Sequence, residues 1–117
     1  MNKISYETRK NLYMEYICHY GSLKQAGVAI EEMSELTKEL SKNIFRGEQN
    51  REQIVDELAD VTIMLEQLRL IYEVNDDVCE HMDAKIERMY ERLHKTAPIN
   101  ARERRERVQE LKNAGEH

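Results

Sequence analysis

The chain has 117 residues, of which 40% are hydrophobic and 35% are charged, with one proline, four glycines and no tryptophan. This length fits a single domain, and so few turn-forming residues exclude an all-β fold. No apolar run approaches the ~18 residues of a membrane span, and the N-terminus lacks the apolar core of a signal peptide. We therefore expect an all-α cytoplasmic protein in which Cys18 and Cys79 are buried, reduced thiols.

The net charge of −5 arises within residues 29–60, which hold nine acidic and four basic residues. An acidic chain disfavours non-specific binding to nucleic acid. The local excess of carboxylates indicates either a solvated helix face or a site for a cation.

Caps and apolar spacing predict five helices, and the short connections between them favour antiparallel neighbours. Gly21 is typical of a helix C-terminus, capping patterns begin at Ser22, Asn50 and Asn100, and Pro98 excludes helix just before it. The sequence predicts a four-helix bundle with an additional C-terminal helix. The expected helices span about 5–20, 22–44, 50–72, 76–95 and 100–115.

Two acidic motifs lie at matching positions on the second and third expected helices. On helical wheels, Glu32 and Glu57 fall about 60° to one side of the apolar stripe, whereas Glu35 and Asp60 fall about 120° to that side. Because the two helices run antiparallel, equal offsets bring all four carboxylates to one groove. Carboxylates are the ligands that Mg²⁺ and Mn²⁺ prefer. The apolar stripes consist of Ala29, Met33, Leu36, Leu40 and Ile44, and of Ile54, Leu58, Val61, Leu65, Leu68 and Tyr72.

The run Glu31–Glu35 followed by Asp56–Asp60 resembles the signature of the MazG-like all-α nucleoside triphosphate pyrophosphohydrolases, Glu-x-x-Glu, a spacer, then Glu-x-x-Asp. The spacer here has 21 residues, and the resemblance covers roughly residues 20–95. It implies a MazG-like domain over 1–98 with a helical extension over 99–117. It also implies Mg²⁺-dependent cleavage of a nucleoside triphosphate to the monophosphate and pyrophosphate, by a homodimer or homotetramer.

The resemblance assigns roles to individual residues. It implies that Mg²⁺, or Mn²⁺ in its place, is held by Glu32, Glu35, Glu57 and Asp60. Glu31 or Glu35 is then the carboxylate that orients or deprotonates a water molecule. The phosphate-binding candidates share one face of the fourth helix and are Lys85, Arg88 and Arg92. Their alternative is an exposed face paired with Glu87 and Glu91.

No motif identifies the base of the nucleotide. Gln25 and tyrosines of the first helix are candidates for contact with a base, although Tyr13, Tyr16 and Tyr20 also have the spacing of ordinary core positions. The arginine-rich segment after Pro98 alternates with glutamates, which favours an oligomer contact or a solvated helix over a nucleic-acid arm.

Two other functions compete with the pyrophosphohydrolase. A di-iron carboxylate bundle needs two Glu-x-x-His pairs, and the chain offers only Glu91 with His94. A helical oligomerisation or regulatory module that keeps a metal- or nucleotide-binding signature without turnover is the stronger alternative.

Overall fold

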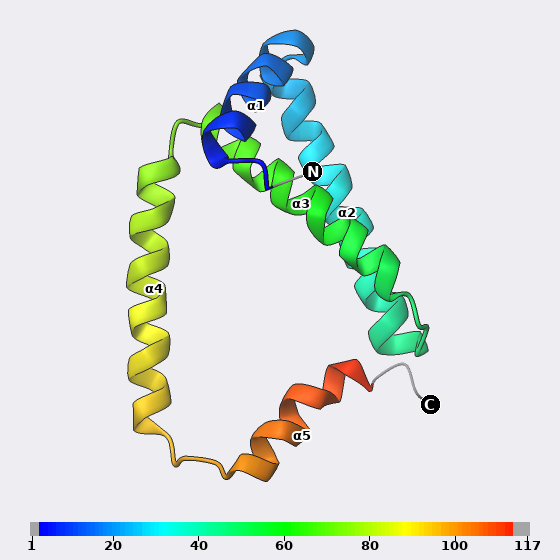
Figure 1. Ribbon diagram of the computed structural model, residues 1–117, viewed down its shortest axis with the longest axis vertical. Coiled ribbons are helices and arrows are strands. Elements are labelled where there is room, and N and C mark those ends of the chain that lie inside the picture. The colour runs from blue at the N-terminus through cyan, green and yellow to red at the C-terminus, as the bar shows by residue number, and fades with distance from the viewer. Residues whose placement is uncertain (1–2, 114–117) are drawn as a thin grey trace.

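The computed structural model describes residues 3–113, and over these residues the protein consists of five α-helices with no strand (Figure 1). This confirms the all-α fold with an additional C-terminal helix. The expected end of the last helix near Gly115 lies outside the described residues. The helices are α1 (Tyr6–Tyr20), α2 (Ser22–Arg46), α3 (Arg51–Ile71), α4 (Asn75–Lys95) and α5 (Ala101–Lys112).

The centre of the fold is the antiparallel pair α2–α3, which packs side by side over most of its length (Figure 1). α2 ends at Gly47, whose φ of +67° is a left-handed conformation that glycine adopts without strain. The Glu48 N–H then donates to the Lys42 carbonyl at 3.2 Å, which closes the end of the helix. The two helices are therefore joined by a tight turn, and this turn makes them neighbours.

The buried faces of α2 and α3 are rotated from the predicted apolar stripes toward the acidic motifs, and the rotation is larger on α3. Val61, Met64 and Gln67 are the buried residues of α3, whereas Leu58 and Leu65 are nearly half exposed. The predicted apolar stripes are thus wrong in part, because packing follows shape and hydrogen bonding as well as hydrophobicity. The stripe residues that the structure exposes are Met33, Ile44, Leu58, Leu65 and Tyr72.

α1 lies across the α2–α3 pair at the end away from their connection (Figure 1). Arg9 holds it there through an ion pair with Glu66 of α3 (Nε–Oε2 3.2 Å), and Tyr13 is buried in the contact. Gly21 alone joins α1 to α2. It also occupies the N-cap of α2, so the capping pattern expected at Ser22 does not form.

The capping pattern at Asn100 is confirmed, since its side chain accepts a hydrogen bond from the Glu103 N–H at 2.8 Å. Asn50 is the N-cap residue of α3 by position only. Its side chain makes no capping bond and reaches across to α2 instead. The short connection explains this, because it holds Asn50 against the last turns of α2.

α4 leaves α3 after a turn at Glu73 and diverges from the α2–α3 pair, and α5 lies beyond it (Figure 1). α4 contacts α3 near this turn, where Arg69 donates to the Met82 sulfur at 3.4 Å. Neither α4 nor α5 buries a residue. The four-helix packing is therefore not completed within one chain.

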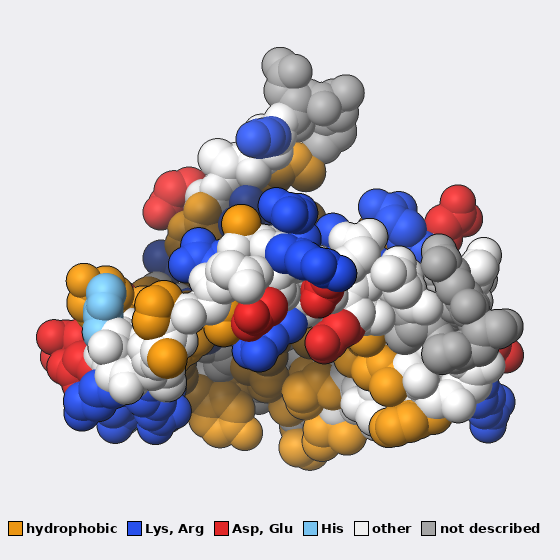
Figure 2. All heavy atoms as spheres, turned by 90° about the horizontal axis from the view of Figure 1, so that it is seen from below, with side chains coloured by type: hydrophobic (Ala, Val, Ile, Leu, Met, Phe, Trp, Pro, Cys, Tyr) orange, Lys and Arg blue, Asp and Glu red, His pale blue; other side chains and the backbone are white. Residues whose placement is uncertain are grey.

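Hydrophobic side chains consequently remain at the surface, along the lower edge of the face in Figure 2 and beside groups of Lys and Arg. Both cysteines are exposed, so the prediction of buried thiols is wrong. Cys79 is exposed because α4 has little packed against it, and Cys18 because it lies on the outer side of α1. No helix of the described chain is both long and apolar enough to cross a membrane.

Candidate metal centre

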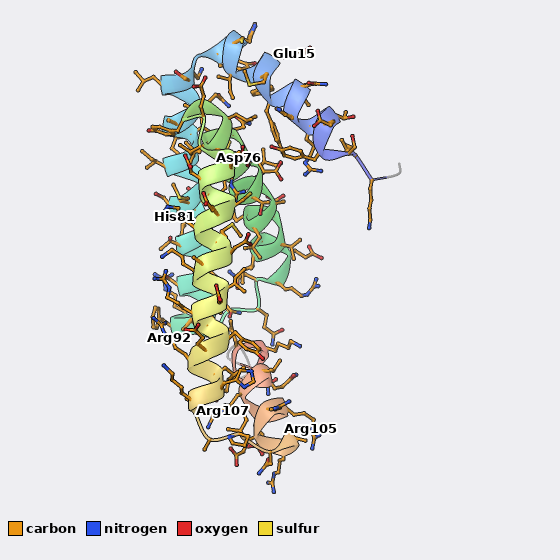
Figure 3. The ribbon with its side chains drawn as sticks, turned by 90° about the vertical axis from the view of Figure 1, so that its left-hand side faces the viewer. Glu15, Asp76, His81, Arg92, Arg105 and Arg107 are labelled. Carbon is orange, nitrogen blue, oxygen red and sulfur yellow. The ribbon has the colours of Figure 1, made fainter. Side chains whose placement is uncertain are left out.

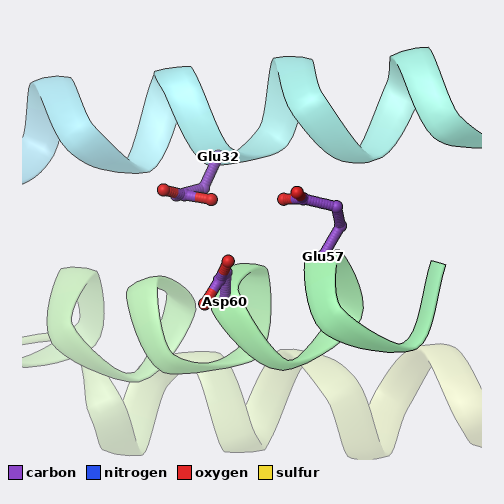
Figure 4. Close-up of side chains that lie close together, drawn as sticks. All are labelled: Glu32, Glu57 and Asp60. Atoms are coloured by element: carbon purple, nitrogen blue, oxygen red, sulfur yellow. The ribbon is translucent and has the colours of Figure 1, made fainter. Parts of the chain in front are cut away.

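Three carboxylates meet between α2 and α3, at the position that the acidic motifs predict. Glu32 extends from α2 toward Glu57 and Asp60 of α3 (Figure 4). One oxygen of each side chain lies within 4.8 Å of the others, and all three residues are half-buried. Ala29, one turn before Glu32, is only 1% exposed, and its small side chain lets the helices approach closely here.

The crowding changes how these groups hold protons. Burial raises the pKa of Glu32, and the charges of Asp60 and Glu57 raise it further. Burial is also the largest cause of the raised pKa of Glu57, followed by the charge of Asp60. In the protein without a cation, the cluster therefore retains a proton above the ordinary pKa of a carboxyl group.

The donor set fits a hard divalent cation. Glu57 Oε2 is fully enclosed and has no hydrogen-bond partner among the described residues. An enclosed carboxylate oxygen without a partner is costly, and a cation is the partner that also relieves repulsion from neighbouring acids. Oxygen ligands of this kind suit Mg²⁺ or Mn²⁺. Glu32, Glu57 and Asp60 are the residues that would hold it.

The other predicted acids are exposed, and one of them lies at the edge of this cluster. Glu35 is exposed, but its charge acts on Glu57 and raises the pKa of that group, so it lies within electrostatic range. Glu31 is also exposed. Three of the four predicted ligands are thus brought together, with the fourth beside them.

The predicted phosphate-binding residues are not part of this cluster within one chain. Lys85, Arg88 and Arg92 are exposed on α4, and their side chains form no hydrogen bond or ion pair between residues 3 and 113. Their alternative pairing with Glu87 and Glu91 is absent there as well. Figure 3 shows Arg92 on the half of α4 that is nearer α5, far from Glu15 on α1.

A pocket of about 460 Å³ lies one turn from the acids, at the junction of α1, α2 and α3. Val28 precedes Glu32 by four residues and Met64 follows Asp60 by four, so the pocket begins roughly 6 Å along each helix from the carboxylates. Tyr16 of α1 forms part of its wall. This volume lies within the range of small-molecule sites.

Two buried glutamines line the pocket, and each is only 4% exposed. Gln25 Nε2 donates to Gln67 Oε1 at 2.8 Å, which joins α2 to α3. Gln25 is among the residues expected from the sequence to contact a base, whereas no sequence motif indicates Gln67. The available signal was an uncharged polar residue in the helical register of Met64, at the edge of an apolar stripe.

The tyrosines of α1 have different environments. Tyr13 is buried and its hydroxyl has no hydrogen-bond partner among the described residues, whereas Tyr16 and Tyr20 are about half exposed with ring centroids 4.9 Å apart. Only Tyr13 is therefore a core residue, and Tyr16 and Tyr20 leave aromatic surface at the pocket.

No family model matches the sequence, and neither curated proteins nor solved structures gave a match. The resemblance to MazG-like enzymes thus depends on the motif residues alone. The two Glu-x-x-His pairs of a di-iron site find no support. Among the described residues, the only group of three or more potential ligands is Glu32, Glu57 and Asp60.

Proposed function

We propose that the protein is a Mg²⁺-dependent nucleoside triphosphate pyrophosphohydrolase, which releases pyrophosphate and a nucleoside monophosphate. The observation that carries the proposal is the enclosed, unpaired oxygen of Glu57 within a cluster of three carboxylates. The second support is the pocket one turn from the carboxylates. In a nucleotide only the pentose lies between the base and the α-phosphate, so a base in this pocket would have its phosphates near the cation.

The residues would divide the work as follows. Glu32, Glu57 and Asp60 hold the cation, with Glu35 completing the set. Bound Mg²⁺ neutralises phosphate charge and lowers the pKa of bound water. Glu35 is exposed and acts electrostatically on the cluster, so its carboxylate can accept a proton from the attacking water and pass it to solvent. Glu31, which is also exposed, is the alternative for this role. The pocket at Tyr16 and Tyr20 orients the substrate by holding its base.

We further propose that the active form is a homodimer or homotetramer. The α4 side chains Met82, Ile86, Met89 and Leu93 recur at intervals of four, three and four residues, so they form one apolar face. That face is exposed, as are Met33 and Leu58 on α2 and α3. In a two-fold dimer, α4 of each copy can cover the α2–α3 pair of the other. Such an arrangement also supplies Lys85, Arg88 and Arg92 to a site that lacks basic residues.

The test is release of pyrophosphate from the purified protein with Mg²⁺, against the standard ribo- and deoxyribonucleoside triphosphates and triphosphates of damaged bases. We expect release from at least one of them, and loss of release with EDTA. Binding of nucleotides or Mg²⁺ without release from any of them would support the alternative, a helical oligomerisation or regulatory module.

A further inference from the structure

We infer that Gln25 and Gln67 read the edge of the base, and that they accept amino and oxo bases alike because the amide pair can reverse. This inference rests on the proposed function for the identity of the ligand. It deepens that function by assigning the residues that set its base specificity.

The Gln25–Gln67 pair keeps hydrogen-bonding groups that its own bond does not use. An amide side chain has one carbonyl acceptor and two N–H donors. The bond from Gln25 to Gln67 uses Gln25 Nε2 and Gln67 Oε1, and it leaves Gln25 Oε1 and Gln67 Nε2. Among the described residues these two atoms have no partner, and neither belongs to the fully enclosed polar atoms. They are therefore reached from the pocket that both side chains line.

These free groups determine the chemistry of a matching ligand. One free acceptor beside one free donor complements a group that offers a donor beside an acceptor, and the Watson–Crick edge of a base has this form. The pocket wall supplies the aromatic surface of Tyr16 and Tyr20 for the flat face of a heterocycle. A purely apolar occupant would leave two buried amide atoms unpaired, at a cost in affinity.

The hydrogen bond between the two amides can run in either direction. If both amides turn by 180°, Gln67 donates to Gln25 through the same short contact, and the side chains keep their shape. The free donor and acceptor then exchange places. Cytosine and adenine present an amino donor beside a ring acceptor, whereas uracil and hypoxanthine present an oxo acceptor beside a ring donor. Each orientation of the pair matches one of these classes, so neither class leaves a buried group unpaired.

The experiment measures binding of nucleoside monophosphates to the full chain in EDTA, by calorimetry, with cytidine against uridine and adenosine against inosine monophosphate. For the ring size that the pocket holds, we expect the amino and oxo members to bind within about threefold of each other. A pair fixed in one direction would instead prefer one member by about 10–100-fold, the cost of an unpaired buried group. That preference would overturn the inference, and so would absence of binding by all four.

The variant Gln67→Glu removes the free donor. A carboxylate only accepts, so Gln25 must donate to it and both remaining atoms become acceptors. An amino base and an oxo base each offer one donor and one acceptor, so either base then leaves one acceptor unmatched. At pH 8 we expect both members to bind about tenfold or more weakly. Gln53→Glu on exposed helix surface introduces the same charge and leaves both affinities unchanged. Unchanged affinities in Gln67→Glu would remove both glutamines from base reading.

Gln25→Glu provides a second test if Gln67→Glu does not fold. It also leaves two acceptors, so it must weaken binding of both members by a similar factor. Because these measurements use no metal and no turnover, they remain informative if pyrophosphate release fails. Conversely, release with nucleotide affinities that neither variant changes would contradict this inference and leave the proposed function intact.

Discussion

The Asn50 amide nitrogen donates both to the backbone carbonyl of Glu39, at 2.9 Å, and to its carboxylate, at 2.6 Å. Glu32 precedes Glu39 by seven residues, and Glu57 follows Asn50 by seven. Seven residues are about two helical turns, and equal distances from one contact in an antiparallel pair give opposite positions. The contact between Asn50 and Glu39 therefore sets the register that places Glu32 opposite Glu57.

Asn50→Ala should lower the melting temperature by about 5 °C at pH 7, since it removes two partly buried hydrogen bonds. The bond from Asn50 lowers the pKa of Glu39 below its usual 4.5, so it stabilises the fold above pH 4.5 and is lost as the pH falls through the lowered pKa. The difference between the two proteins should thus shrink in acid. Melting from pH 7 to pH 3 checks this. Asn11→Ala on exposed α1 is the control, and an equal loss there would contradict the role of Asn50.

Glu57→Gln should raise the melting temperature in EDTA by about 3–5 °C, because one charge leaves a crowded site. The variant should gain less from added Mg²⁺ or Mn²⁺, since cation binding stabilises only the folded state that holds the ion. Pyrophosphate release should fall at least ~100-fold, as the loss of a residue that merely supports a ligand already costs about 10–100-fold.

The matched control is Glu15→Gln, which removes one negative charge from the exposed surface of α1, outside the carboxylate cluster (Figure 3). It should keep the stabilisation that the cation gives to the wild type. If Glu57→Gln keeps it as well, Glu57 is not a ligand.

Arg88→Ala should raise the KM for the triphosphate about tenfold or more, because a hydrogen bond to a charged phosphate is lost. Its melting temperature should stay within about 1 °C of wild type, since Arg88 is exposed and makes no contact that stabilises the described fold. Steady-state kinetics of the variant beside Arg105→Ala on α5 provide the check. Equal KM values in all three proteins would leave Arg88 as solvated surface.

Ile86→Ser should weaken self-association at least tenfold, since Ile86 lies in the middle of the apolar face of α4. Glu87→Ser, the next residue, points away from that face and should leave association unchanged. Sedimentation equilibrium at micromolar concentration measures both. A wild-type protein that sediments as a monomer would contradict the proposed assembly outright.

Much of the fold could be predicted because it depends on local signals. The five helices follow from caps, glycines and apolar spacing, and the Asn100 cap forms as expected. The direction of α4 could not be predicted, because its apolar face fits a bundle within the chain and an interface between copies equally well. The exposure of Cys79 follows from that same ambiguity.

The candidate site could be predicted in part for a similar reason. Equal wheel offsets predicted correctly that Glu32 and Glu57 face each other. They also predicted that Glu35 and Asp60 lie equally close to the cluster, which is not the case. The structure includes Asp60 and leaves Glu35 at the edge because α3 is rotated further toward the acids than α2. The bond between Gln25 and Gln67 joins the helices on this rotated face, and a wheel of hydrophobic residues counts both side chains as polar.

The single residue between α1 and α2 fixes where the tyrosines of α1 lie. Gly21 combines a φ of +98° with a ψ of 144°, a region open to almost no residue but glycine. A Cβ at position 21 would meet nothing within 4 Å, so a substitution there costs backbone strain and causes no steric clash. Gly21→Ala should therefore lower the melting temperature, which thermal unfolding measures. The direction of α1, and with it the tyrosine wall of the pocket, thus depends on one backbone position that only glycine occupies without strain.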